Sequence, residues 1–299
     1  MRKYNKNLLK RQYYDRLFRY NEKKAVLLYF NSKTNYKQQT LIMMSDSLVI
    51  IPTYNEKENV RNIINAVLAL EEHQFDVLIV DDNSPDGTGA IVDEMIAERP
   101  DRIHILKRAG KQGLGTAYIA GFKWALDRHY EYVIEMDADF SHPVSKLPEL
   151  QATCASGQAD LSVGSRYLTG VNVVDWPMGR MLMSYYASAY VRLITGMDVR
   201  DTTAGFVCYR REVLQSIDLD AIEFKGYAFQ IEMKFTAHRM GFRIKEVPIV
   251  FVNRVLGTSK MNSSIFFEAL WGVIKLRWDS IFNKARFTRR PLPKQITAG

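Results

Sequence analysis

Cysteine is scarce in this chain of 299 residues, which contains two, Cys154 and Cys208. Two cysteines cannot build the disulfide network of a small secreted domain, so a reducing, cytoplasmic setting is expected. Neither of them, nor His142, has the spacing of a zinc motif, so zinc is not supported. The chain also lacks an uninterrupted apolar run of about 20 residues, so no membrane-spanning helix is predicted.

Most of the chain has no surplus of positive charge, although the net charge of the whole chain is +8. Residues 1–42 hold eleven Lys and Arg against Asp15 and Glu22, and the remaining residues hold 30 basic against 31 acidic side chains. A nucleic-acid-binding domain would carry its basic residues on the folded body. We therefore predict no nucleic-acid partner.

Residues 1–42 form a basic extension rich in Asn and Tyr. Its longest apolar run, Ala25–Phe30, is too short to cross a bilayer and no cleavage site follows it, so a signal peptide is not expected. One hypothesis is that translation begins at Met43 or Met44 and that the extension is not native. The other is a basic arm, disordered or lying on anionic lipid.

Residues 263–299 are predicted to form an amphipathic helix and a basic tail. Large apolar and aromatic residues of Ser264–Phe282 are interrupted by four charges, and five Lys or Arg follow. Two hypotheses stay open. The helix packs on the domain and leaves a solvated tail, or it lies in a membrane interface with the tail against anionic headgroups.

Residues 43–262 alternate between short apolar runs and segments with helical spacing. Strands are expected at Ser47–Ile51, Asp76–Val80, Ile103–Leu106, Tyr132–Met136 and Asp160–Val163. Helices are expected at Glu58–Leu70, Gly89–Ala97, Thr116–Arg128 and Val144–Ser156. Strands separated by helices of this length predict an α/β domain, with a mostly parallel sheet and helices on both faces.

Four of the predicted strands are followed by polar clusters, at Pro52–Glu56, Asp81–Thr88, Asp137–Pro143 and Gly164–Tyr167. Turns favour the same residue types, so one cluster alone would carry little weight. Ligands of parallel sheets bind beyond the carboxyl ends of the strands. The four clusters together therefore predict a cleft with converging acids.

The strongest candidate for catalysis is Asp137-Ala138-Asp139. Two carboxylates one residue apart can hold a divalent cation, Mg²⁺ or Mn²⁺, together with phosphate oxygens of a substrate. Without a cation the two acids repel and one tends to take up a proton. The alternative for an isolated motif of this kind is a loop in which Asp caps a helix.

Three other motifs are incomplete. The segment from Asp82 to Asp93 imitates a calcium loop in part, but Ser84 and the short Asp93 are poor ligands there. Gly113-Leu-Gly115 lacks the third glycine of a dinucleotide site, and the chain has no Walker A lysine motif. Calcium binding, a Rossmann dehydrogenase and a P-loop ATPase are all disfavoured.

Several cations are predicted to lie near the cleft. Arg166, Arg254 and Lys260 fall in loops, and each could equally be an ordinary surface charge. Arg180 and Ser184 are four residues apart in the predicted helix Pro177–Ile194 and so share one face. The Met, Leu and Tyr residues of that helix suit a lip for an apolar substrate, or a helix that covers the core.

Taken in order, the motifs resemble polyprenol-phosphate (dolichol-phosphate) mannosyltransferases, which are inverting family 2 glycosyltransferases of GT-A fold. The resemblance covers about Leu48 to Lys260 and rests on Pro52–Glu56, Val80–Thr88, Gly113–Tyr118, Met136–Asp139, Gly164–Tyr167, Gly226–Glu232, Glu246–Ile249 and Arg254–Lys260. It implies transfer of mannose from GDP-mannose to a polyprenyl phosphate lipid.

The resemblance also implies roles for individual residues. It assigns the guanosine to Pro52, Tyr54, Glu56, Val80 and Asp82, and the metal and diphosphate to Asp137, Ala138 and Asp139. Arg254 and Lys260 belong to a loop over the diphosphate, and Arg166, Arg180 and Ser184 to the acceptor phosphate. Asp137, Asp139 and Arg166 are the expected catalytic residues, with Asp137 and Asp139 as the metal ligands.

The chain departs from the family pattern in two places. Ser141 stands where some members have a Gln metal ligand, so water is expected to complete the metal shell. The carboxy-terminal transmembrane helices of some relatives are absent, so peripheral attachment to the cytoplasmic face of a membrane is expected.

Two alternative functions stay open. The first is a related enzyme that uses UDP-glucose or a hydroxyl acceptor, although the Gln-Xaa-Xaa-Arg-Trp motif of processive synthases is absent. The second is an inactive nucleotide-binding domain that acts as a membrane scaffold. The presence of both acids of the Asp137–Asp139 motif argues against it.

Overall fold

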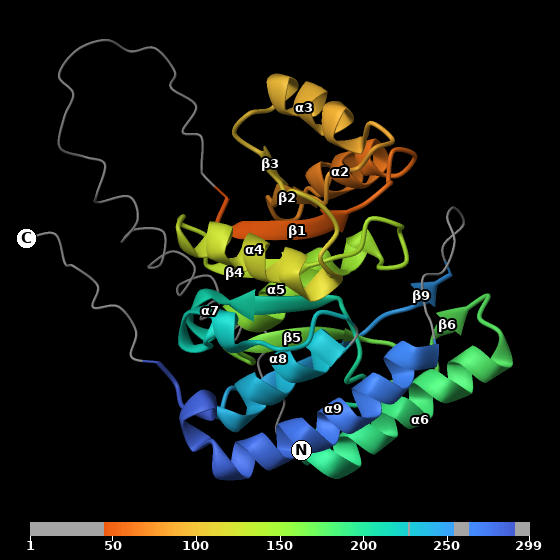
Figure 1. The fold of residues 1–299 in the computed structure, drawn as a ribbon. Coiled ribbons are helices and arrows are strands. Elements are labelled where there is room, and N and C mark those ends of the chain that lie inside the picture. The colour runs from red at the N-terminus through yellow and green to blue at the C-terminus, as the bar shows by residue number, and fades with distance from the viewer. Residues whose placement is uncertain (1–44, 227, 254–262, 291–299) are drawn as a thin grey trace, which may run out of the picture. The chain divides into compact units, whose positions relative to one another are not determined.

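A seven-stranded sheet forms the centre of the protein (Figure 1). The computed structural model describes residues 45–226, 228–253 and 263–290. The strand order is β3-β2-β1-β4-β7-β5-β8. The strands are β1 (Ser47–Thr53), β2 (Asp76–Asp81), β3 (Ile103–Lys107), β4 (Tyr132–Glu135), β5 (Leu161–Ser165), β7 (Val207–Arg210) and β8 (Ile244–Pro248).

Strand direction confirms the predicted α/β class with a mostly parallel sheet. β1 pairs in parallel with β2 and β4, β2 with β3, and β5 with β8. Within the described sheet β7 alone runs antiparallel, to β4 and β5. The carboxyl ends of the other six strands therefore lie along one edge, and β7 contributes the loop before its first residue to that edge.

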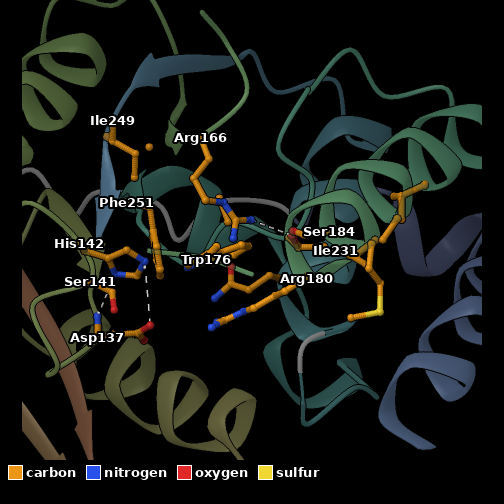
Figure 2. Close-up of a pocket in the computed structure, with 18 of the residues that line it drawn as sticks. Asp137, Ser141, His142, Arg166, Trp176, Arg180, Ser184, Ile231, Ile249 and Phe251 are labelled. Atoms are coloured by element: carbon orange, nitrogen blue, oxygen red, sulfur yellow. Dashed lines mark hydrogen bonds and ion pairs between the residues drawn. The ribbon is translucent and has the colours of Figure 1, made fainter. Parts of the chain in front are cut away.

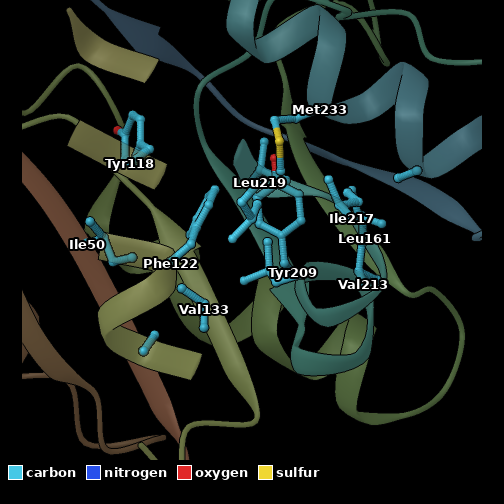
Figure 3. Close-up of a cluster of buried hydrophobic side chains, with 14 of the residues drawn as sticks. Ile50, Tyr118, Phe122, Val133, Leu161, Tyr209, Val213, Ile217, Leu219 and Met233 are labelled. Carbon is cyan, nitrogen blue, oxygen red and sulfur yellow. The ribbon is translucent and has the colours of Figure 1, made fainter. Parts of the chain in front are cut away.

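Helices cover both faces of the sheet, as predicted. α2 (Val60–Leu68), α3 (Thr88–Glu98) and α5 (Leu147–Ala155) pack on one face, and α4 (Leu114–Leu126), α7 (Arg211–Ser216) and α8 (Ala228–Arg239) on the other. The alternation of β1 separates the two cores, because Leu48 and Ile50 face α4 while Val49 and Ile51 face α2. Figure 3 shows Phe122 of α4 beside Tyr209 of β7 in the first core.

The predicted elements that the structure describes are present with shifted ends. The helix expected at Val144–Ser156 begins as a 3₁₀ turn, η2 (Val144–Lys146), before α5. The sequence analysis missed β7, β8 and α8. Ten of the twelve residues of α8 are buried, polar and apolar alike, so all sides of the helix are covered. Its sequence therefore lacks the amphipathic period that would predict a helix.

A third layer lies outside α8. It consists of α6 (Met178–Thr195) and α9 (Ser263–Phe282), which lie side by side in Figure 1. Val191 and Val273 pack with Phe235 of α8 in a separate apolar cluster. Close approach at α9 depends on Gly272, where a Cβ atom would lie 2.5 Å from the Phe224 ring. Among the described residues, no helix has the length and apolar character needed to span a bilayer.

Short segments complete the fold near the third layer. β6 (Val173–Val174) and β9 (Phe251–Val252) pair in parallel as a small second sheet. Two 3₁₀ turns, η3 (Leu219–Ala221) and η4 (Lys284–Phe287), follow α7 and α9. The predicted extension 1–42 lies outside the described residues, and the domain boundaries at 43–262 and 263–299 stay predictions.

Candidate active site

A pocket lies at the carboxyl ends of β4, β5 and β8, bounded by α6, α8 and α9 (Figure 2). Five residues that the sequence singled out line it, namely Asp137, Asp139, Arg166, Arg180 and Ser184. They come from the loop after β4, the loop after β5, and one face of α6. Two of the four predicted polar clusters, Asp137–Pro143 and Gly164–Tyr167, thus meet in this pocket.

The Asp137–Asp139 motif follows β4 after one intervening residue, Met136. Ala138 is buried, while Asp137 and Asp139 are partly exposed to the pocket. The Ser141 N–H donates to Asp139 Oδ1 at 3.1 Å, which holds the loop closed. Phe140 between them has a φ of 60°, in a region that few residues other than glycine adopt. This conformation is unfavourable for Phe140, and strained backbone of this kind is common at functional sites.

His142 supports the first acid from behind, and sequence reasoning missed it. Its Nδ1 accepts the backbone N–H of Asp137 at 3.1 Å, and its Nε2 lies 3.9 Å from Asp137 Oδ2. The ring stacks on Phe206 with centroids 5.0 Å apart. Burial lowers the pKa of His142, which keeps Nδ1 as an acceptor. The signal that could have revealed it is its position three residues after Asp139 in the loop.

Arg166 is fixed by a buried acid that lies far along the chain. Its Nε and Nη2 donate to the two carboxylate oxygens of Asp201 at 2.7 and 2.6 Å, and Nη2 also donates to Thr203 Oγ1 at 2.9 Å. Burial alone would raise the pKa of Asp201, but the charge and hydrogen bonds of Arg166 hold it below its ordinary value. Such a bidentate pair sets the plane of the guanidinium.

Arg180 meets Arg166 across one indole ring. The guanidinium carbons of Arg180 and Arg166 lie 4.1 and 5.5 Å from the ring centroid of Trp176. Arg180 also donates to Asn253 Oδ1 at 3.2 Å. In Figure 2 the two arginines and Trp176 lie between Asp137 and His142 on one side and Ser184 on the other. Two cations held this close favour a ligand with more than one negative charge.

Ser184 takes part in the same wall of the pocket. Its Oγ accepts the Tyr167 hydroxyl at 2.8 Å. Burial raises the pKa of Tyr167, so this hydroxyl keeps its proton and the bond keeps its direction. The hydroxyl proton of Ser184 is then directed elsewhere, and an acceptor in the pocket can receive it.

The residues implied for the guanosine lie at the neighbouring strand ends but do not line this pocket. β1 contains Pro52 near its end and is followed by Tyr54 and Glu56. β2 contains Val80 near its end and is followed by Asp82. Val80 is fully buried, main chain included, so none of its atoms is exposed in this structure.

Two cations beside the guanosine residues were missed by the sequence analysis. Arg108 forms an ion pair with Asp82 at 2.9 Å, and the Lys111 ammonium lies 5.2 Å from the Tyr54 ring centroid. Burial raises the pKa of Asp82 in spite of Arg108. Both cations belong to the loop after β3, and their signal in the sequence is the basic stretch Lys107–Lys111.

A buried polar network joins β4, which precedes Asp137, to the segment Asp201–Ala204, which binds Arg166. Gln230 Nε2 donates to Glu135 Oε2 at 2.8 Å, and Lys234 Nζ donates to Ala204 O at 2.7 Å and to Gln230 O at 3.0 Å. Burial raises the pKa of Glu135 to about 8 and lowers that of Lys234 to about 8. Because Glu135 precedes the acid motif and Ala204 follows Thr203, α8 holds both halves of the pocket.

The donor set at Asp137 and Asp139 fits a hard cation. Their carboxylates supply the oxygen ligands that Mg²⁺ and Mn²⁺ prefer, and both line the same pocket. The described residues contain no group of three His, Cys, Asp or Glu placed to hold a metal. Two protein ligands are enough for a cation that takes its other ligands from phosphate and water. Arg254 and Lys260 lie outside the described residues.

The fold is that of the GT-A glycosyltransferases. A mannosyltransferase from Pyrobaculum calidifontis, solved in complex with GDP-mannose and Mn²⁺, is similar with a TM-score of 0.51 and 16% identity, over 80% of this chain and 64% of that one. Residues 48–218 match the model of glycosyl transferase family 2. The chain belongs to this family, and the predicted resemblance is confirmed.

Two relatives are each 48% identical to this chain. One is the polyprenol monophosphomannose synthase of Mycolicibacterium smegmatis, matched over 76% of this chain and 87% of the relative. The other is the undecaprenyl-phosphate mannosyltransferase of Micrococcus luteus, matched over 78% of this chain and 96% of the relative. The protein is therefore a glycosyltransferase similar to enzymes that are named for mannosyl transfer.

Proposed function

We propose that this protein transfers mannose from GDP-mannose to a polyprenyl phosphate, with inversion at the anomeric carbon. The observation that carries the proposal is the pairing, in one pocket, of Asp137 and Asp139 with Arg166 and Arg180. One pair suits a cation and a diphosphate, and the other suits a phosphate monoester. The names of the two relatives support the same sugar and the same class of acceptor.

The donor is assigned to the edge formed by β1, β2 and β4. Pro52, Tyr54, Glu56, Val80 and Asp82 are assigned to the guanosine, and the diphosphate would reach Asp137, Ala138 and Asp139. A relative of the same fold was solved with GDP-mannose and Mn²⁺, which supports this nucleotide and a divalent cation. When bound, the cation would neutralise the charge that develops on the departing diphosphate. We assign Arg254 and Lys260 to the same diphosphate.

The acceptor is assigned to Arg166, Arg180 and Ser184. A phosphate monoester has a second pKa near 6 and is mostly a dianion at neutral pH, so it needs no general base. Among the described residues, Asp137 and Asp139 are the only carboxylates that line the pocket. The work left to Arg166 and Arg180 is to position the acceptor oxygen behind the anomeric carbon.

The bonding change is a single displacement. The acceptor oxygen forms a bond to the anomeric carbon, and the bond from that carbon to the diphosphate breaks with its electron pair passing to GDP. The sugar passes through an oxocarbenium-like state. The protein's contribution is orientation on one side and charge stabilisation on the other.

A substitution at Asp139 tests the proposal. Asp139→Ala is expected to abolish transfer of radiolabelled mannose into a lipid extract at every pH, because a metal ligand and not a base is lost. UDP-glucose, assayed beside GDP-mannose, is expected to give no labelled lipid, and a hydroxyl acceptor none either. An active Asp139→Ala variant would contradict the metal assignment.

The alternative of an inactive scaffold predicts a different result. It requires that wild-type protein bind a nucleotide but transfer no sugar from either donor. Because the described pocket holds an ordered acceptor side as well as the acids, we favour the enzyme. The lipid acceptor also places the site at a membrane surface, and we propose peripheral attachment on its cytoplasmic face.

A further inference from the structure

One aromatic side chain, Trp176, contacts both arginines that are assigned to the acceptor phosphate. Trp176 lines the pocket, and the guanidinium carbon of Arg180 lies 4.1 Å from the centroid of its ring. The guanidinium carbon of Arg166 lies 5.5 Å from the same centroid. Figure 2 shows the Trp176 ring beside both guanidinium groups. A single indole therefore joins the two cations of the acceptor side.

The indole changes the electrostatics of this pair. Two guanidinium groups beside one ring repel each other, and the repulsion grows as water is excluded. The side chain of Arg166 is only 10% exposed. The face of an aromatic ring carries partial negative charge and attracts a cation within about 6 Å of its centroid, most strongly in Trp. Trp176 therefore offsets part of the repulsion between Arg166 and Arg180 before any phosphate binds.

A second ring holds Trp176 in place. Phe251 meets it edge-on, with ring centroids 5.4 Å apart and an interplanar angle of 78°. The centroid of Phe251 also lies 5.5 Å from the Arg166 guanidinium carbon and 5.6 Å from the centroid of His142. Because His142 holds the backbone of Asp137, the two rings connect the acceptor arginines to the acid loop.

The backbone before Trp176 is fixed by the small sheet of β6 and β9. Val174 O accepts the Asn253 N–H at 3.1 Å, and Asp175 O accepts the side-chain amide of Asn253 at 3.3 Å. Asp175 has a φ of 59°, a conformation that persists where surrounding contacts enforce it. Asn253 Oδ1 accepts Arg180 as well. The side chain of Asn253 thus fixes Arg180 and the segment that carries Trp176 relative to each other.

We propose that Trp176 is a positioning residue for the acceptor, whose electron-rich face holds Arg166 and Arg180 together as one site for a phosphate with two negative charges. This rests on the proposed function, because that function assigns the two arginines to the acceptor phosphate. Without the ring, Arg180 moves away from Arg166 and the phosphate loses one of its two cations. The attacking oxygen is then aligned less well behind the anomeric carbon.

The first test is steady-state kinetics with a short, detergent-dispersed polyprenyl phosphate. Trp176→Leu removes the aromatic face and should raise the KM for this acceptor about fivefold to thirtyfold, as expected for the loss of contacts with two cations. Trp176→Phe keeps a weaker face and should give an intermediate KM. The KM for GDP-mannose should stay within about twofold of wild type, because the residues assigned to the guanosine do not line this pocket.

A second test changes the charge of the ring face and keeps its shape. Fluorine withdraws electron density from an indole, so mono-, di- and trifluorinated tryptophan placed at position 176 should raise the acceptor KM stepwise. The matched control is the same series at Trp124, outside the pocket, where the Arg128 guanidinium carbon lies 3.5 Å from the ring centroid. Fluorination of Trp124 should leave both KM values unchanged.

Two results would overturn the proposal. One is an acceptor KM that stays within about twofold of wild type in Trp176→Leu. The other is an acceptor KM that does not respond to fluorination at position 176, which would leave Trp176 with a packing role alone. The fluorinated series decides the matter if Trp176→Leu does not fold.

Binding in the absence of donor separates this proposal from the proposed function. The Kd of geranyl phosphate, measured by isothermal titration calorimetry, should follow the same order among the Trp176 variants. Wild type that binds in this order but transfers no mannose would refute the function and keep the role of Trp176. Transfer with KM and Kd that are independent of the ring would refute the role of Trp176 and keep the function. Absence of both binding and transfer would overturn both.

Discussion

His142 shows how one residue outside the assigned motif can control it. Its Nδ1 holds the backbone of Asp137, so replacing the ring by Phe leaves that N–H without its acceptor. We expect His142→Phe to lower kcat by about tenfold to a hundredfold and to raise the Mn²⁺ concentration for half-maximal rate, as loss of a ligand's supporting partner does. His142→Asn, which restores an acceptor, should recover part of the rate. The measurement is initial rate against Mn²⁺ concentration.

The control for His142 is His238→Gln, on α8 outside the pocket, which should leave both values unchanged. A His142→Phe enzyme with the wild-type rate and metal dependence would show that the loop holds Asp137 without the imidazole.

Asp201 carries a prediction about stability. Because its folded pKa is lowered, its ionised form contributes stability above its ordinary pKa of about 4, and this is lost as the pH falls through the folded value. Asp201→Asn leaves Arg166 with a weaker partner and should lower the free energy of unfolding by about 3 to 5 kcal/mol at pH 7. The difference from wild type should shrink below about pH 4, as urea unfolding would show.

A matched acid gives the contrast. Asp93 pairs with Lys107 at 2.6 Å on the exposed surface. Asp93→Asn should lower the free energy of unfolding by less than about 1 kcal/mol. Equal small losses for Asp201→Asn and Asp93→Asn would mean that the buried pair adds nothing to stability.

At the scale of the elements, Gly115 has a packing role that the sequence alone did not reveal. A Cβ atom there would lie 2.7 Å from the Phe229 ring of α8 and 2.9 Å from the carbonyl oxygen of Phe224, so glycine lets α4 approach α8. Gly115→Ala is expected to lower the free energy of unfolding by about 1 to 3 kcal/mol. Gly110→Ala, with nothing within 4 Å of the added atom, is the control and should be nearly neutral. Equal effects in thermal unfolding would contradict the close approach.

The elements that the sequence predicted each carry a local signal of their own. β1, β2 and β4 are apolar runs, and α2 and α4 show helical spacing or good helix formers between turn residues. β8 escaped prediction because its alternating residues Ile244–Pro248 belong to a partly exposed edge strand. β7 has four residues and passes directly into α7, so no turn marks its end.

At the scale of the whole molecule, nucleotide binding should stabilise the fold because the guanosine residues and the metal acids belong to different strands of one sheet. GDP with Mn²⁺ at about 100 times its Kd should add about 2.7 kcal/mol, which raises Tm by about 5 °C. UDP with Mn²⁺ should give a much smaller shift, and chelation of the metal should remove most of the GDP shift. The measurement is differential scanning fluorimetry.

The Asp139→Ala protein is the control for this experiment, since it should lose the part of the shift that depends on Mn²⁺. A larger shift with UDP than with GDP would overturn the assignment of the donor and favour the UDP-glucose alternative.

The sequence by itself determined the α/β class, the family and the residues that carry charge at the strand ends, because strand runs, turn residues and the order of motifs are local. Asp137, Asp139 and Arg166 could be named from their positions after apolar runs. The partners of these residues could not, since Asp201 and Gln230 reach the site across 35 and 95 positions of the chain. The tertiary structure alone decided that the tail arginines pair with Glu232, Glu223 and Asp218, and that α6 and α9 expose apolar faces beside the pocket. Burial and side-chain pairing depend on contacts between residues that are far apart in the chain, so a local sequence pattern does not predict them.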